Sequence, residues 1–327
     1  ASQVAASVQS QSGVKGVQSI VYQEKSAWRS HYCLIDAGAV ECGGNDSGKQ
    51  VSGAPNDLRG VSLLALSPTN SCAFASSTMY CWGSWLASLQ AKNKLASIVR
   101  VPLPSNTTVA TAVAGSLGVL IQTSDGRFWR WSLNATTTNQ SWVGTSTAGL
   151  PKGFQVNSWA VGASASVEGA PLCALGKDSR VYCGAISKEF LPRKMVFWNS
   201  GFQQLNLLRT SVPASGATNY GIESWCGMRT LSGINRLVCS PQPFSGAAAS
   251  FAANNSVKSI TGIMPGLACA VLSKGEGVCL KGSSVYNLQK GGLGYNSSYA
   301  TGNNITCAIN NFGELNCWGY NLSLIHI

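Results

Sequence analysis

Residues 307–321 read CAINNFGELNCWGYN, and this stretch decides the fold of the chain. Two cysteines stand ten positions apart, a turn-forming NNFGE lies between them, and a Trp-Gly pair follows directly. Related segments begin at Cys72, Cys173 and Cys269, and they read CAFASSTMYCWGS, CALGKDSRVYCGA and CAVLSKGEGVCLKG. A centre rich in Asn, Asp, Gly and Ser between two apolar stretches is typical of a β-hairpin. The sequence therefore repeats one strand-turn-strand cassette.

The cysteines are expected to form disulfides within each cassette. One long interval between cassettes holds VLIQTSDGRFWRWS at 119–132, which has the same shape without cysteines. We align Val119 with the first cysteine position and Trp129 with the second. Both cysteines are missing together, as expected of a bonded pair. The predicted pairs are Cys33–Cys42, Cys72–Cys81, Cys173–Cys183, Cys226–Cys239, Cys269–Cys279 and Cys307–Cys317.

Seven units of roughly 40–50 residues are typical of a propeller, a solenoid or a linear array. Another short apolar stretch precedes most cassettes, and convincing helical periodicity is almost absent. Three or four short strands per unit predict an all-β, seven-bladed β-propeller with a disulfide in six blades. We expect the propeller to span residues 17–321, with cassettes at 33–42, 72–81, 119–129, 173–183, 226–239, 269–279 and 307–317. Residues 1–16 either add a ring-closing strand or form a loose terminus.

Composition excludes several classes of function. The net charge of +11 arises from scarce acids, and charged residues make up only 11% of the chain. The bases are scattered, whereas nucleic-acid-binding proteins usually carry a dense basic stripe, so we expect no nucleic-acid partner. The apolar runs are too short to span a membrane. Twelve cysteines without CxxC spacing and only two histidines predict neither a metal site nor a cofactor.

The same cysteines indicate an oxidising compartment, so we expect an extracellular or cell-surface protein from the secretory pathway. Seven sequons that do not involve the tail 322–327 agree with this localisation and are candidate glycosylation sites: Asn45, Asn106, Asn134, Asn139, Asn254, Asn296 and Asn304. The last six residues, LSLIHI at 322–327, match the translation of a common transposase adaptor. We interpret them as a sequencing artefact and expect the native protein to continue.

Candidate functional residues are few. His31 is expected at a surface or blade edge, and the carboxylates are dispersed, so no catalytic residue and no enzymatic activity are predicted. The longer segments 85–108, 133–155, 164–171 and 211–224 vary between units, and such loops often gather on a binding face. Aromatic residues in or near these segments are candidates for ligand contact or, equally, for packing between blades: Trp85, Trp142, Trp198 and Tyr220. Trp82 and Trp318 are expected in the core.

The units resemble the regulator of chromosome condensation propeller in its secreted, cysteine-rich form. That form is the extracellular crinkly-repeat domain of plant crinkly-type receptor-like kinases, whose repeats begin Cys-Ala/Gly-Leu and end Cys-Trp-Gly. Full Cys-Trp-Gly ends occur here at 81–83 and 317–319, whereas Cys42, Cys183, Cys239 and Cys279 depart from the pattern. The resemblance covers residues 17–321. It implies a receptor ectodomain that is followed, outside this sequence, by a membrane span and a cytoplasmic Ser/Thr kinase.

The favoured interpretation is an extracellular ligand-binding module, either the ectodomain of a plant receptor-like kinase or a fragment of one. Its partner would be an extracellular peptide, protein or cell-wall polymer, with membrane contact only through a segment absent from this sequence. The first alternative is a free secreted propeller that acts as a lectin-like or inhibitor protein, and the second is a propeller hydrolase. A homo-oligomer is compatible with each of these.

Overall fold

A computed structural model of the chain describes seventeen stretches of sequence. They are residues 9–10, 17–23, 31–44, 46, 48–67, 70–83, 98–115, 118–132, 142–145, 149–161, 171–186, 192–210, 222–264, 267–287, 295–301, 305–310 and 315–319. The tail 322–327, interpreted above as an artefact, lies outside them, as does most of the segment 1–16.

The described strands form seven antiparallel sheets, which we number blade 1 to blade 7 in chain order. Blade 1 holds β2 (Val17–Gln23), β3 (His31–Asp36) and β4 (Ala39–Gly44). Blade 2 holds β5 (Val61–Ser67), β6 (Asn70–Ala75), β7 (Thr78–Gly83) and β8 (Val99–Pro102). Blade 3 holds β9 (Val109–Gly115), β10 (Gly118–Thr123), β11 (Phe128–Ser132) and β12 (Val143–Thr145).

The second half of the chain continues the pattern. Blade 4 holds β13 (Val156–Val161), β14 (Pro171–Gly176), β15 (Arg180–Ile186) and β16 (Pro192–Ser200). Blade 5 holds β17 (Phe202–Thr210), β18 (Ile222–Leu231) and β19 (Ile234–Ser240). Blade 6 holds β20 (Val257–Met264), β21 (Leu267–Leu272), β22 (Gly277–Lys281) and β23 (Ser284–Asn287). Blade 7 holds β24 (Tyr295–Thr301), β25 (Ile305–Asn310) and β26 (Leu315–Gly319).

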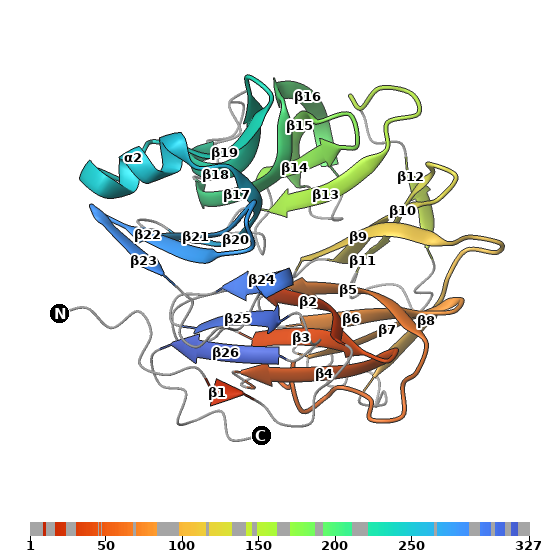
Figure 1. Cartoon of the computed structure of the whole chain (residues 1–327). Coiled ribbons are helices and arrows are strands. Elements are labelled where there is room, and N and C mark those ends of the chain that lie inside the picture. The colour runs from red at the N-terminus through yellow and green to blue at the C-terminus, as the bar shows by residue number, and fades with distance from the viewer. Residues whose placement is uncertain are drawn as a thin grey trace.

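The blades follow one another around a closed ring (Figure 1). The first strand of each blade contacts the first strand of the next, and β24 of blade 7 contacts β2 of blade 1. At the outer edge of blade 7, β1 (Gln9–Ser10) pairs with β26, and Gln9 lies opposite Cys317. The N-terminal segment therefore adds a strand to the last blade. The predicted seven-bladed propeller is confirmed.

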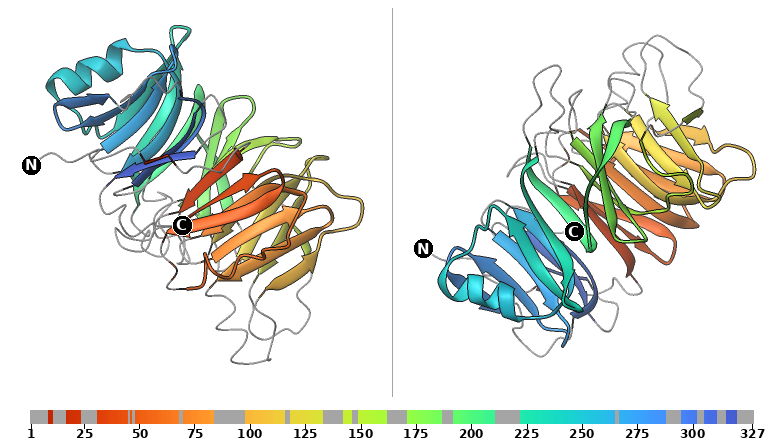
Figure 2. Two further views of the ribbon diagram at one scale, coloured as in Figure 1. Left: turned by 60° about the horizontal axis from the view of Figure 1, so that its bottom comes forward. Right: turned by 90° about the horizontal axis from the view of Figure 1, so that it is seen from above.

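A short helix was not predicted from the sequence. Helix α2 (Gly246–Asn254) follows β19 and contacts both β19 and β23, so it lies along the outer edges of blades 5 and 6 (Figure 2). Its composition is alanine-rich, and Ala248 and Ala252, one turn apart, are the residues it buries. Small side chains allow close approach to the sheet but give no strong amphipathic signal.

Disulfides join the second and third strands of five blades. The bonded pairs are Cys33–Cys42, Cys72–Cys81, Cys173–Cys183, Cys226–Cys239 and Cys269–Cys279. In every pair the cysteines lie directly opposite each other, with Cα atoms 4.0–4.2 Å apart. Cys307 and Cys317 occupy the same register in blade 7, but their side chains lie outside the described part. Five of the six predicted disulfides are therefore present.

The register of blade 3 corrects the sequence alignment by one residue. In five of the other six blades the first cysteine is the third residue of its strand, and the corresponding residue of β10 is Leu120. Leu120 lies opposite Arg130, whereas Val119 lies opposite Trp131. The cysteine positions are thus occupied by Leu120 and Arg130, not by Val119 and Trp129. Trp131 takes the place that Trp82 has in blade 2, opposite the residue before the cysteine.

The core is divided among the blades, and its two largest fully buried side chains are Trp82 and Trp131. The Trp82 indole donates a hydrogen bond to the Gln50 carbonyl (2.8 Å), which ties blade 2 to the segment that follows blade 1. The predicted core position of Trp82 is confirmed, and the side chain of Trp318 lies outside the described residues.

The alternation of strands gives the ring two different ends. Connections from second to third strands are short hairpins, and they share one end with the links between blades; we call this end the hairpin face. Hydrogen bonds from a hairpin to such a link recur there, for example Ser124 N to Thr108 O (2.8 Å) and Lys177 N to Gln155 O (2.9 Å). Much of the four variable segments expected to carry binding loops, namely residues 85–97, 133–141, 164–170 and 211–221, lies outside the described residues.

Candidate binding surface

Two of the four aromatic candidates from the sequence are described, and both pack internally. The Trp142 ring packs against the core shared by blades 1 to 3. The Trp198 ring stacks on Phe202, with ring centroids 5.9 Å apart, and meets Trp225 edge-on at 5.3 Å. Packing between blades is the alternative role that the sequence left open for these residues. Trp85 and Tyr220 lie outside the described residues.

Two of the predicted glycosylation sites can be placed with their side chains. Asn106 lies in an exposed turn before β9, and Asn254 is the exposed last residue of α2. Asn296 lies on β24 without a described side chain, and Asn45, Asn134, Asn139 and Asn304 lie outside the described part. Both placed residues are accessible to a glycan, and glycosylation remains a prediction.

On the hairpin face, blades 3 and 4 carry the same Asp-x-Arg turn. In blade 3 the Arg127 guanidinium binds Asp125 Oδ2 through Nε at 2.7 Å and Nη2 at 2.6 Å. In blade 4 Arg180 binds Asp178 Oδ2 in the same way, at 2.6 Å for both atoms. Each carboxylate also accepts the backbone N–H of its own arginine. These contacts hold the turns in one conformation, although such exposed pairs contribute little to stability.

Ionisation of the two carboxyls follows from these contacts. Hydrogen bonds from the Arg127 side chain, Thr123 and the Arg127 backbone hold the pKa of Asp125 well below its usual range. For Asp178, burial acts to raise the pKa, but the hydrogen bonds and the charge of Arg180 outweigh it and lower the pKa. Both turns therefore present an ionised carboxylate that is already bound to an arginine.

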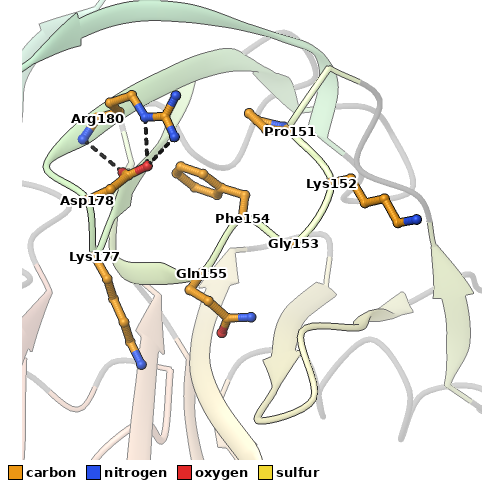
Figure 3. Close-up of a pocket in the computed structure, with 8 residues that line it drawn as sticks. All are labelled: Pro151, Lys152, Gly153, Phe154, Gln155, Lys177, Asp178 and Arg180. Carbon is orange, nitrogen blue, oxygen red and sulfur yellow. Dashed lines mark hydrogen bonds and ion pairs between the residues drawn. The ribbon is translucent and has the colours of Figure 1, made fainter.

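A hollow of about 280 Å³ lies beside the second of these turns, in blade 4 (Figure 3). Its lining consists of Pro151, Lys152, Gly153, Phe154, Gln155, Lys177, Asp178 and Arg180. The Phe154 ring points toward the Asp178–Arg180 pair, and the two lysine side chains extend from different sides. Three cations and one carboxylate give the lining a formal charge of +2. Neither lysine has an ion-pair partner within the described part of the chain.

The neighbouring blade supports the floor of this hollow. The buried side chain of Gln122, in blade 3, donates to the Phe154 carbonyl (2.7 Å) and accepts from the Val156 N–H (2.8 Å). The Phe154 ring packs edge-on against Tyr182, with centroids 5.0 Å apart. Two hydrogen bonds from the Gln122 side chain and one aromatic contact pre-organise this segment, which reduces the entropy lost when a ligand binds.

Hydrogen bonds link the blade 4 hairpin, which lines this hollow, to blade 5. The Ser179 carbonyl accepts the Phe202 N–H (3.2 Å), and the Ser179 hydroxyl accepts from Gln203 Nε2 (2.9 Å). Arg229 reaches back to the Ser200 carbonyl (3.2 Å) and lies over the Phe202 ring. Hydrogen bonds therefore connect the blade 4 hairpin, the β16–β17 turn and the blade 5 hairpin in a continuous row.

Exposed apolar side chains flank this row. Phe197 on β16 is 56% exposed and packs edge-on against Tyr182, the residue two positions beyond Arg180. Leu231 and Ile234 lie opposite each other at the tip of the blade 5 hairpin and are 39% and 42% exposed. We define the blade 4–5 surface as Lys152, Lys177, Asp178, Arg180, Phe197, Arg229, Leu231 and Ile234. The sequence prediction missed it, although the Asp-x-Arg motif at 125–127 and 178–180 is a visible signal.

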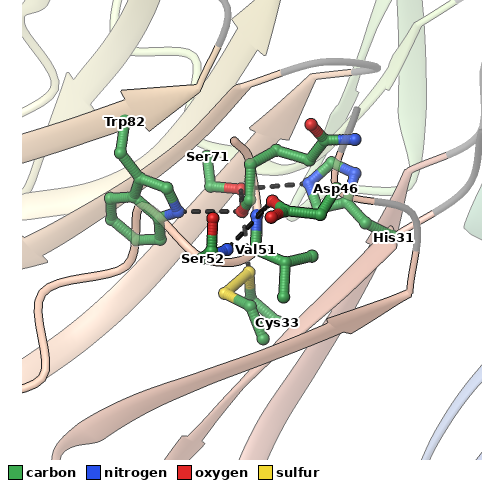
Figure 4. Close-up of a disulfide and its surroundings, with 9 residues drawn as sticks. His31, Cys33, Asp46, Val51, Ser52, Ser71 and Trp82 are labelled. Carbon is green, nitrogen blue, oxygen red and sulfur yellow. Dashed lines mark hydrogen bonds between the residues drawn. A yellow bond between two sulfur atoms is a disulfide. The ribbon is translucent and has the colours of Figure 1, made fainter. Parts of the chain in front are cut away.

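His31 corrects another expectation, because it is buried with no exposed surface rather than at a surface or blade edge. Its Nε2 lies 3.0 Å from Ser71 Oγ, and the Ser71 hydroxyl donates to the Gln50 carbonyl at 3.1 Å (Figure 4). Burial lowers the His31 pKa to about 4, and the charge of Asp46 opposes this shift. A neutral histidine and a buried serine with no exposed surface form a structural cluster that no substrate reaches.

Among the described side chains, His, Cys, Asp and Glu residues form no group of three or more that is arranged to hold a metal ion. The helical part of the described chain is too short and too weakly apolar to cross a membrane.

Comparison with known proteins shows the fold. No protein-family model and no curated protein sequence matches the chain. The CRINKLY ectodomain of the Arabidopsis thaliana receptor kinase ACR4 matches with a TM-score of 0.52 and 18% identity, covering 93% of this chain and 96% of that one. The ectodomain of the Physcomitrella patens receptor kinase CR4 matches with a TM-score of 0.52 and 14% identity, covering 93% and 74%.

Propellers outside the receptor kinases match with similar TM-scores. Yeast RCC1 (Prp20), in its structure with Kap60, has a TM-score of 0.55 and 10% identity, and the match covers 94% of this chain and 79% of that one. Receptor-kinase ectodomains and RCC1-like propellers are therefore both structural neighbours. At these identities the likeness is one of fold.

Proposed function

We propose that the chain is an extracellular ligand-binding module, either the ectodomain of a plant receptor-like kinase or a fragment of one. In this role the propeller binds a peptide, protein or cell-wall polymer outside the cell. The kinase reaction and the membrane anchor belong to parts of the protein that this sequence does not contain. The chain itself acts by binding and carries no catalytic step.

The observation that carries the proposal is the repeated disulfide. Five blades hold one at the same register, and nine of the ten bonded cysteines are described as buried. Closing a loop of about ten residues stabilises a fold by roughly 2.5–3 kcal/mol in the simple entropy model. Disulfides persist in oxidising compartments and are rare in the cytosol and nucleus. Structural likeness to two receptor-kinase ectodomains supports the same compartment.

The chemical state of the native protein tests the proposal. Protein isolated from its source is denatured with and without reductant, treated with a thiol-alkylating reagent and weighed by mass spectrometry. We expect no alkylation without reductant, and a loss of mass after treatment with an N-glycosidase. Alkylation of all twelve cysteines without reductant, or an unglycosylated protein in the nuclear fraction, would contradict an extracellular role.

A further inference from the structure

We propose that the blade 4–5 surface binds an acidic peptide segment in which apolar side chains alternate with carboxylates. This rests on the proposed role as an extracellular binding module and names the chemistry of the ligand. The first argument is charge. Lys152, Lys177, Arg180 and Arg229 lie on the surface, and Asp178 is its one carboxylate, so its formal charge is +3. A surface of one dominant sign attracts ligands of the opposite sign and accelerates their association.

The second argument is shape. The hollow beside Phe154 has an aromatic floor and a cationic lining, and it is large enough for one carboxylate side chain. Exposed Lys152 and Lys177 are free to turn toward that carboxylate, since no described acid holds them. Arg180 is fixed in place by Asp178 and offers its remaining N–H groups. An acidic side chain is therefore the group that this hollow suits.

The third argument separates a peptide from an acidic polysaccharide. A polysaccharide would neutralise the lysines but would leave Leu231 and Ile234 in water. Burying such apolar side chains contributes about 25 cal/mol per Å². An extended peptide places successive side chains on opposite faces, so every second residue faces the surface. Such a chain brings a carboxylate to the cationic hollow. Its apolar side chains can then pack on Phe197 or on the blade 5 hairpin, so the peptide contacts both the charged and the apolar part of the surface.

The test is a selection followed by a binding measurement. A phage library of random decapeptides is selected on the immobilised chain. We expect enriched peptides to carry a net negative charge and at least two large apolar residues. The affinity of one enriched peptide, labelled with fluorescein, is then measured by anisotropy. We expect the affinity to fall several-fold between 50 and 500 mM salt, because exposed ion pairs are screened.

Variants locate the binding site. Lys177→Gln and Leu231→Ser are each expected to weaken binding of the selected peptide roughly three- to tenfold. Two matched controls lie on blade 6: Lys274→Gln, in the corresponding hairpin, and Val285→Ser, which removes an exposed apolar side chain. Both controls are expected to leave the affinity unchanged, and circular dichroism checks that each variant is folded.

Three results would overturn the inference. They are enriched peptides without acidic residues, equal losses in the blade 6 controls, and tight binding of an oligogalacturonate that the Leu231→Ser variant does not weaken. None of them bears on disulfide state or glycosylation, so the proposed extracellular role would stand. Conversely, twelve free thiols in the native protein would overturn the extracellular role even if the surface bound acidic peptides.

Discussion

His31 is expected to make the stability of the propeller depend on pH, because its imidazole is buried. The Ser71 hydroxyl donates to the Gln50 carbonyl, so its oxygen accepts a hydrogen bond from the Nε2–H of neutral His31. The other ring nitrogen, Nδ1, is buried without a hydrogen-bond partner among the described residues. Protonation would place an unsatisfied N–H and a positive charge in the core. The folded state therefore keeps His31 neutral.

The sign and size of the effect follow from the pKa values. The His31 pKa is about 4 in the folded chain, against 6.5 for a free side chain. Between these values the unfolded chain binds more protons, so acidification favours unfolding. The loss begins as the pH falls below 6.5, amounts to about 2 kcal/mol at pH 5, and levels off near 3 kcal/mol below pH 4.

The measurement compares the native chain with His31→Gln. Glutamine keeps a donor for Ser71 but does not ionise, whereas all other titrating groups are common to both proteins. Between pH 7.5 and pH 5, we expect the native chain to lose about 2 kcal/mol more than the variant. For 327 residues this corresponds to a difference of roughly 3 °C in the fall of Tm, which scanning fluorimetry resolves. Identical pH profiles for the two proteins would refute a buried neutral His31.

Three other predictions concern contacts within and between blades. Gln122→Ala removes both hydrogen bonds to the blade 4 link and leaves two buried backbone groups unsatisfied. We expect the free energy of unfolding, measured with urea, to fall by about 2–4 kcal/mol. The exposed Gln203→Ala is the control and should change it little. The double variant Leu120→Cys with Arg130→Cys should form the disulfide missing from blade 3 and raise Tm, because the two residues lie directly opposite each other. The double variant Val119→Cys with Trp129→Cys should remain reduced in a thiol assay. Its two residues are diagonal neighbours, whose Cα atoms stand about 7 Å apart. Trp82→Phe should cost about 2 kcal/mol in the same urea assay, through the lost hydrogen bond to Gln50 and the cavity, and an unchanged midpoint would contradict the core role of Trp82.

The cysteines explain why the fold was predictable from the sequence. A disulfide between neighbouring strands defines both the turn and the register, so a pair such as Cys72 and Cys81 identifies its hairpin without structural data. Blade 3 lacks this covalent marker. There an apolar residue and an aromatic residue were aligned with the cysteines, and the alignment was off by one, because Val119 and Leu120 are equally hydrophobic.

Features that depend on contacts between blades were not predictable. The burial of His31 requires Ser71 from the next blade and the Gln50 carbonyl, both far away in the sequence. The blade 4–5 surface arises because the ring places two hairpins side by side. Arg180 and Arg229 are 49 positions apart, and no motif in the sequence between them predicts that the two hairpins are neighbours. The helix α2 was not predicted, because its alanine-rich sequence lacks the amphipathic periodicity that indicates a helix.

The native transcript downstream of codon 321 tests the central claim most directly. RNA from the source organism is extended past Asn321, and the reading frame is followed to its stop codon. An ectodomain predicts a stretch of about 20 apolar residues, long enough to span a membrane, and then a protein kinase domain. A stop codon soon after Asn321 would contradict the receptor assignment and leave a free secreted propeller.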